Sequence, residues 1–196
     1  MAPFAHIIGL YSNVDGLLDA RGTTQQQSWF VDQIKQTPPD KWLVVAVHHP
    51  CYSLDSTHGG YGEVLSALDA AFEKAGRVPD AVLSGHVHDC QRYSRNLGGV
   101  SVPYIVSGNG GYANTQRSLH KLQKGLETQQ LPYSTKRAGV ALEYYDTANA
   151  GFLRLTATAD QLLIEYFSVS FDDPPVVSPS AADRVTVSAA GAPKSP

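Results

Sequence analysis

The sequence predicts an α/β fold built on a parallel β-sheet. Three apolar runs have the length and composition of strands, and they lie at 4–12, 42–47 and 81–84. Helical patterns separate them, which places strand, helix, strand, helix and strand in order along the chain. Such an order requires crossovers over the sheet face, and it brings the carboxyl ends of the strands to one edge. The loops that follow these strands are therefore expected to meet.

The first helix is expected between the first two strands. Thr24 and Gln27 have the spacing of a capping box, and Trp29 and Ile34 then belong to an apolar stripe. Pro38 forbids continuation, so the helix has about three turns.

The second strand and the second helix have clearer patterns. The run 42–47 is uninterrupted, apolar and rich in β-branched residues, which is typical of a strand covered on both faces. Apolar residues then recur at helical spacing, at Val64, Leu65, Leu68, Ala71 and Phe72. Gly76 stands where a C-cap glycine is expected.

The second half of the chain is expected to add strands of another kind. Val102 to Ser107 reads as a further strand, followed by the glycine-rich loop 108–111, which is either an ordinary turn or part of a site. Residues 112–140 are polar and uneven, with a short helix expected at 118–126. The runs 152–158 and 162–169 predict an antiparallel hairpin.

Composition excludes several classes of protein. The 196 residues are 42% hydrophobic, enough for a real core, and the formal charge is -3 without a Lys/Arg cluster. We therefore expect neither a nucleic acid nor a membrane as a partner. The longest apolar run is too short to span a bilayer, and the N-terminus lacks the basic region and apolar core of a signal peptide.

Histidines follow two of the predicted strands directly. His48 and His49 come after the second strand, and the third strand leads into Gly85, His86 and His88. Glycine lets the backbone pass close to a ligand, and neutral imidazole is a common ligand for borderline metals. The shared sheet edge therefore predicts a metal site. The alternative is a pair of exposed turns that carry histidines.

These motifs, with the following Gln91-Arg92-Tyr93, resemble the calcineurin-like metallophosphoesterases, and most closely their purple acid phosphatase-like members. The resemblance runs from about Phe4 to Val169. It implies part of a four-layer α/β/β/α sandwich, with a mixed sheet and the C-terminal hairpin. Residues 1–170 would be the C-terminal half of the catalytic domain, and the Pro/Ser/Ala-rich tail 171–196 is expected to be poorly ordered.

The resemblance also implies roles for five histidines. His48 and His86 would bind one metal ion, and His88 would bind the other. His58 lies in the loop where related phosphatases contact the substrate phosphate, and either His58 or His49 would contact the phosphate or donate a proton to the leaving group. The implied cofactors are divalent or trivalent ions of iron, zinc or manganese, and the implied substrate is a small phosphoester.

The sequence departs from the family in its missing motifs. It has no Asp-x-His, no Gly-Asp and no Gly-Asn-His, which supply the bridging aspartate and further ligands. Three imidazoles cannot bridge two ions, so one ion or none is expected. The leading hypothesis is a truncated phosphoester hydrolase with an incomplete dinuclear site, and the alternative is a non-catalytic metal-binding or structural module. Serine esterase chemistry is disfavoured because no Gly-x-Ser-x-Gly elbow is present.

Three further expectations follow. A half domain should expose apolar surface and unpaired strand edges, so we expect a homo-oligomer or association with a missing N-terminal half. Family members are often exported, but this chain carries no signal that defines its compartment. Cys51 and Cys90 each follow a histidine motif, and they are packed thiols, a disulfide or thiolate ligands.

Overall fold

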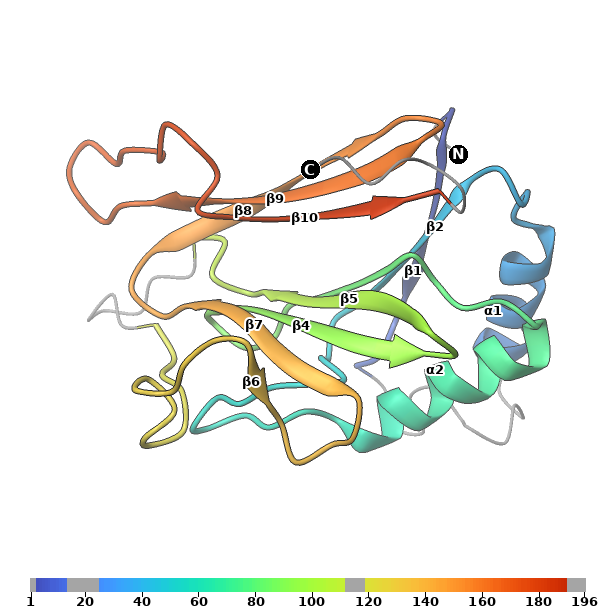
Figure 1. The fold of residues 1–196 in the computed structure, drawn as a ribbon, viewed down its shortest axis with the longest axis horizontal. Helices are drawn as coiled ribbons and strands as arrows, with labels where there is room; N and C mark the ends of the chain where they lie inside the picture. The colour runs from blue at the N-terminus through green and yellow to red at the C-terminus, as the bar shows by residue number, and fades with distance from the viewer. Residues whose placement is uncertain (1–2, 14–24, 112–118, 190–196) are drawn as a thin grey trace.

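The chain folds into two β-sheets and two helices in the computed structural model, which describes residues 3–13, 25–111 and 119–189 (Figure 1). The helices are α1 (Gln25–Gln36) and α2 (Gly62–Ala75). The strands are β1 (Ala5–Leu10), β2 (Trp42–Val47), β3 (Ala81–Ser84), β4 (Cys90–Leu97), β5 (Val100–Ser107), β6 (Tyr133–Ser134), β7 (Val140–Asp146), β8 (Ala150–Ala157), β9 (Gln161–Val169) and β10 (Asp183–Ser188).

The larger sheet is mixed and has seven strands in the order β1-β2-β3-β5-β4-β7-β6. Strands β1, β2, β3 and β5 run parallel to one another, as the order of elements predicted. Strands β4, β7 and β6 continue the sheet in antiparallel fashion. The predicted hairpin is also confirmed, because β8 and β9 pair antiparallel in a separate sheet of three strands.

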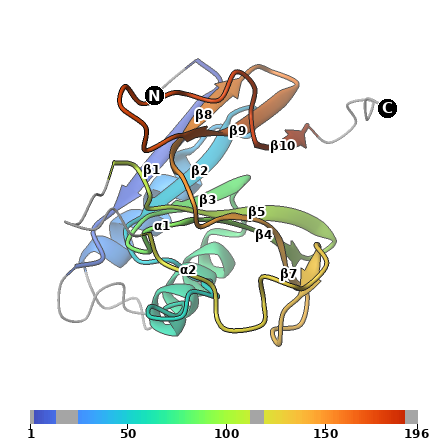
Figure 2. The ribbon, with the colours of Figure 1, turned by 90° about the vertical axis from the view of Figure 1, so that its left-hand side faces the viewer.

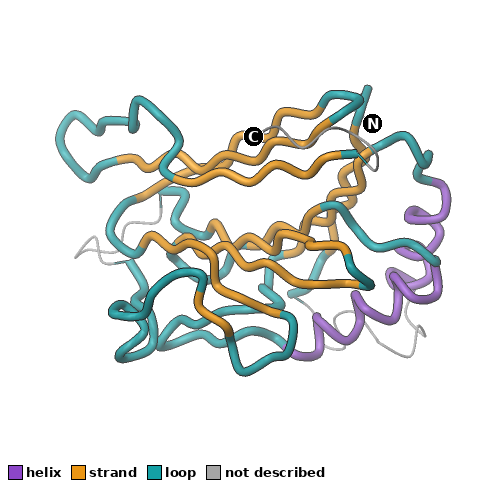
Figure 3. Tube along the Cα trace, in the orientation of Figure 1, coloured by secondary structure: helices purple, strands orange, loops and turns teal. Residues whose placement is uncertain are grey.

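The two faces of the seven-stranded sheet are covered differently. Both helices lie on one side of it, and the three-stranded sheet lies on the other (Figures 2 and 3). Leu43 and Val45 of β2 belong to the core with the helices, whereas Val44 belongs to the core with Leu162 and Ile164 of β9. Successive side chains of a strand point to opposite faces, so β2 must be apolar throughout. This explains its unbroken pattern.

The helices follow their sequence patterns except at Trp29, which was expected in the apolar stripe of α1 and is 44% exposed. Phe30, Val31 and Ile34 are the buried apolar residues of α1, and α2 buries the predicted apolar residues. Gly76 ends α2 with φ 69°, and its amide donates to Glu73 O at 3.1 Å. Thr24 of the expected capping box lies outside the described residues, and Gln27 donates its side-chain amide to Ala67 O at 2.7 Å.

The helix expected at 118–126 is wrong for the described residues 119–126, which form turns and one isolated bridge. The segment pairs instead with the loop after β2. Ser56 N donates to Lys121 O at 2.8 Å, and Gln123 N donates to Leu54 O at 2.9 Å. Tertiary hydrogen bonds therefore replace those of a helix. Two strands that the sequence did not predict, β4 and β7, lie side by side in the sheet.

The tail expected to be poorly ordered contains a strand. Residues 183–188 form β10, which pairs antiparallel with β9, so the expectation is wrong there. Arg92 of β4 donates to Asp183 through Nε at 2.6 Å and through a terminal nitrogen at 2.8 Å. This pair ties β10 to the larger sheet. The domain boundary at residue 170 stays a prediction.

Both cysteines are free and buried. Burial raises the pKa of the Cys51 thiol to about 12 and that of Cys90 well above its usual value. Packed, protonated thiols are therefore the alternative that the structure bears out. Among the described helices, neither is long and apolar enough to cross a membrane.

The tie between β10 and β4 can be tested by replacing its carboxylate. Asp183→Ala should lower the free energy of unfolding by about 1–3 kcal/mol, because it leaves the mostly buried Arg92 guanidinium without its partner. Urea unfolding followed by circular dichroism measures the change. Arg184→Ala removes an exposed neighbour and should stay within about 0.5 kcal/mol. Equal losses in the two variants would contradict the tie.

Candidate metal centre

Two neighbouring strand ends bring three histidines together. Val47, the last residue of β2, is in register with Ser84, the last residue of β3. Gly85 N then donates to His48 O at 3.1 Å, so the two chains stay paired beyond the strands. His48 and His49 leave one strand end and His86 leaves the other, as the order of elements predicted.

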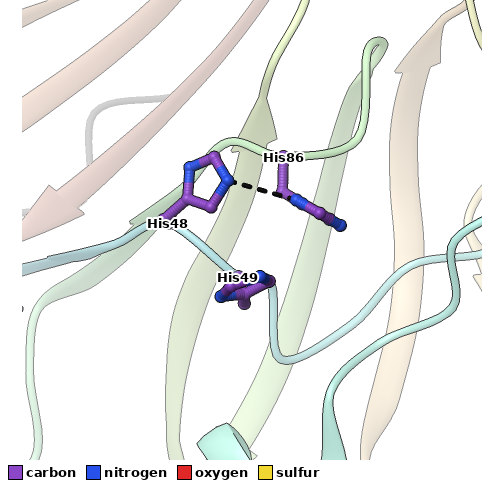
Figure 4. A group of neighbouring side chains, drawn as sticks. All are labelled: His48, His49 and His86. Carbon is purple, nitrogen blue, oxygen red and sulfur yellow. Dashed lines mark hydrogen bonds between the residues drawn. The ribbon is translucent and has the colours of Figure 1, made fainter. Parts of the chain in front are cut away.

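The three side chains point toward one another (Figure 4). His48 Nε2 lies 3.1 Å from His86 Nδ1, and one ring nitrogen from each of the three residues lies within 4.8 Å of the others. The ring of His49 lies 4.9 Å from that of His48 and 4.6 Å from that of His86, centre to centre. This group can offer three nitrogen ligands to one ion.

His49 is held from behind by Ser12. The Ser12 hydroxyl lies 2.9 Å from His49 Nδ1 and accepts a hydrogen bond from His49 N at 3.1 Å. When Nδ1 donates to this hydroxyl, Nε2 keeps its lone pair for a ligand. Burial, and then the nearby His48, lower the pKa of His49. Its ring is therefore neutral at neutral pH.

His86 is the most perturbed member of the group. Its φ of 66° lies in the left-handed region, which costs a non-glycine residue about 1 kcal/mol or more. Its Nε2 lies 2.8 Å from the Tyr61 hydroxyl. Burial lowers its pKa to about 4, helped by the neighbouring His49 and His48. In this backbone conformation the neutral His86 ring lies beside those of His48 and His49.

The structure does not bring His88 into this group. Its ring lies against that of His120, with centroids 4.5 Å apart, and His88 N donates to His120 Nδ1 at 3.2 Å. His58 lies between the two groups, with its ring centre 5.1 Å from those of both His86 and His120. The site therefore consists of two adjoining imidazole groups.

Sequence reasoning missed three of these residues. His120 lies in the polar stretch that carried no pattern, and its Nδ1 is 3.6 Å from Asp55 Oδ1. Tyr61 precedes α2 without a cap-like signal. Ser12 carried the one usable signal, because it follows the first strand and so lies at the same sheet edge as the histidines.

The glycine-rich loop after β5 lies beside the histidine loop. A Cβ atom on Gly108 would stand 2.0 Å from Val87 O, so only glycine fits this close approach. Gly110 lines a groove of about 740 Å³ together with His48, Gly85 and Phe152. This loop was expected to be either an ordinary turn or part of a site, and the structure places it next to the histidines.

Comparisons with known proteins place the chain beside purple acid phosphatases. Purple acid phosphatase 21 of Arabidopsis thaliana is 34% identical over 110 residues, which cover 54% of this chain and 24% of that protein. Purple acid phosphatase 18 of the same plant is 30% identical over 113 residues, 55% of this chain and 24% of that protein. The matches thus span about a quarter of the relatives' length. No family model matches the chain.

Solved structures show the same fold. Purple acid phosphatase PPD1 from yellow lupin (Lupinus luteus) seeds superposes with a TM-score of 0.66 at 21% identity, covering 93% of this chain and 30% of that one. GAP50, described as the anchor in the inner membrane complex of Plasmodium, superposes with a TM-score of 0.52 at 14% identity, covering 84% of this chain and 45% of that one. In sequence and fold, the chain resembles the C-terminal portion of a calcineurin-like metallophosphoesterase.

The close approach at Gly108 predicts a sharp difference between two neighbouring glycines. Gly108→Ala should lower the free energy of unfolding by about 2–4 kcal/mol, because its methyl group collides with the backbone of the histidine loop. At Gly110 the nearest atom is 3.7 Å away, so Gly110→Ala should cost less than about 1 kcal/mol. Urea unfolding compares them. Equal stability of the two variants would show that the loops do not pack as described.

Proposed function

We propose that this chain supplies the C-terminal half of a metal-dependent phosphoester hydrolase site. The observation that carries the proposal is the gathering of His48, His49 and His86 at the carboxyl edge of a sheet whose fold resembles that of purple acid phosphatases. Because the matches cover about a quarter of the relatives, the remaining ligands would come from another part of a longer protein or from a partner chain.

His48 and His86 would hold one ion. Two nitrogens bound about 2.0 Å from a tetrahedral ion lie about 3.3 Å apart, and His48 Nε2 and His86 Nδ1 are 3.1 Å apart. Lowered pKa values keep the rings of His86 and His49 neutral, which is the form that binds metal. The donor set therefore fits an ion of zinc, iron or manganese. Such an ion would polarise a phosphoryl oxygen and lower the pKa of a coordinated water.

The same donor set argues against a complete dinuclear site. Neutral imidazoles bring no negative charge, and the group of three found among the described residues includes no carboxylate. Two ions about 3.5–4 Å apart need an anionic bridge between them. His88, which the family resemblance assigns to the second ion, lies in the adjoining group with His120. We infer that the chain alone holds at most one ion.

His58 and His49 would contact the substrate phosphate or donate a proton to the leaving group. His58 is half-buried and lies at the junction of the two imidazole groups, where a ring N–H could donate to a phosphoryl oxygen. His49 is the more buried of the two, and Ser12 orients its ring. His58 would be the one to donate a proton to the leaving oxygen, because the lowered pKa of His49 keeps that ring neutral. A small phosphoester is the substrate class that suits these groups.

Metal stoichiometry gives the first test. The chain should retain at most one divalent ion, weakly, and His86→Ala should lower its affinity at least tenfold, because that variant removes the nitrogen that pairs with His48. Elemental analysis after dialysis and calorimetric titration with zinc measure both quantities. His6→Ala, which removes an imidazole remote from the group, is the control. Two tightly held ions per chain would overturn the assignment.

Hydrolysis of a chromogenic phosphomonoester tests the function itself. With added manganese, iron or zinc, any rate above the metal blank should fall at least tenfold in His86→Ala and be unchanged in His6→Ala. Equal rates in all three chains would reject catalysis by this chain. The non-catalytic metal-binding or structural module would then stand, and GAP50 shows that a protein described as an anchor has a similar fold.

Assembly gives a further test. Strand β1 is an edge of the larger sheet and β8 an edge of the smaller one, and Ile7 and Phe152 on them are 55% and 45% exposed. Unpaired apolar edges favour association, so we propose a homodimer or larger assembly in the absence of an N-terminal half. Light scattering across a concentration series should give a mass of at least twice 21.1 kDa. A monodisperse monomer with a sharp thermal transition would contradict this proposal.

A further inference from the structure

A cavity of about 310 Å³ lies behind the loop that carries His58, and none of the described histidines lines it. Its walls include Cys51, Ser53 and Gly60 from that loop. The volume lies at the lower end of the range for small-molecule sites. The cavity is therefore separate from the imidazole groups, although one loop borders both.

Aromatic rings make up much of the wall. Tyr52 and Tyr93 are buried, with ring centres 5.8 Å apart, and Tyr133 of β6 closes another side. The Tyr93 hydroxyl donates to Gln91, which also accepts a hydrogen bond from Leu54 N at 2.9 Å. The ring of Tyr93 is thus fixed, and a preformed aromatic wall favours a flat apolar ligand.

Two cations lie at the rim. Lys136 and Arg137 line the cavity and are exposed, and the Arg137 guanidinium lies 6.0 Å from the centre of the Tyr52 ring. Neither forms a salt bridge within the part of the chain that the structure describes. No Asp or Glu is among the described residues that line the cavity. Asp69, whose charge acts on Cys51 and Tyr52, is paired with Arg95, so the rim is positively charged and its two cations form no salt bridge among the described residues.

We propose that this cavity binds an aromatic organic anion, with its ring against the wall that Tyr52 and the half-buried Tyr133 help to form and its acidic group at Lys136 and Arg137. The ring would pack against this aromatic wall, and the anion would receive charge-assisted hydrogen bonds from the two cations. The assignment needs no metal and does not depend on the proposed hydrolase activity.

The test uses 2-naphthoate as the probe and 2-naphthamide as its neutral match. Isothermal titration calorimetry of the full chain should show one saturable site for 2-naphthoate and at least tenfold weaker binding of the amide. Lys136→Gln and Arg137→Gln should each weaken 2-naphthoate binding by about tenfold, because each removes a charged partner. Lys74→Gln, on the exposed side of α2, should leave it unchanged.

A blocking variant locates the site. Gln123 is an exposed residue of the cavity wall, so Gln123→Trp should fill the cavity and abolish binding without loss of fold, which circular dichroism checks. Equal affinity for the acid and the amide would overturn the proposal, as would the absence of saturable binding. Binding that survives in Gln123→Trp but is lost in His86→Ala would place the anion at the imidazole groups and would equally overturn it.

Discussion

The burial of β2 on both faces is the constraint on which the rest of this structure depends. Leu43, Val44 and Val45 have no exposed surface, because helices cover one face of the strand and the three-stranded sheet covers the other. Burying each of these side chains stabilises the folded state by about 1.5–3 kcal/mol relative to leaving it exposed. A strand held this firmly ends at a defined place, and His48 and His49 follow it directly. The position of the histidines is thus a result of core packing.

The parts of the fold that could be predicted are those whose hydrophobic pattern shows within a short stretch of sequence. The apolar run of β2 and the helical spacing in α2 depend on short-range pattern, and so does the hairpin of β8 and β9. Strand β4 could not be found this way, because its sequence CQRYSRNL is largely polar. Its arginines are satisfied by Asp183 and Asp69, residues that are distant in sequence. A local pattern does not contain such partners.

The residues of the candidate site likewise fall into those that could be placed from sequence and those that could not. His48, His49 and His86 follow strands, so the order of elements was enough to predict that they meet. Their separation from His88 was not predictable, because it depends on the turn at His86 and on a ring contact with His120 from a distant loop. Strand ends can be placed from sequence, whereas loop residues are placed by tertiary hydrogen bonds. The roles assigned to all five histidines stay predictions, and those of His58 and His88 depend most on loop placement.

The loop from Cys51 to Tyr61 separates the imidazole groups from the aromatic cavity. One side carries His58 toward the other imidazoles, and the other side forms part of the aromatic cavity. The Ser53 hydroxyl, which borders the cavity, donates to His58 O at 2.8 Å, so the backbone of His58 is braced from behind. At Gly60 this loop is packed too closely to admit a side chain, because a Cβ atom there would lie 2.5 Å from Cys51 O. Because the same loop backbone holds His58 and lines the cavity, a substitution that shifts this loop on one side would also displace it on the other.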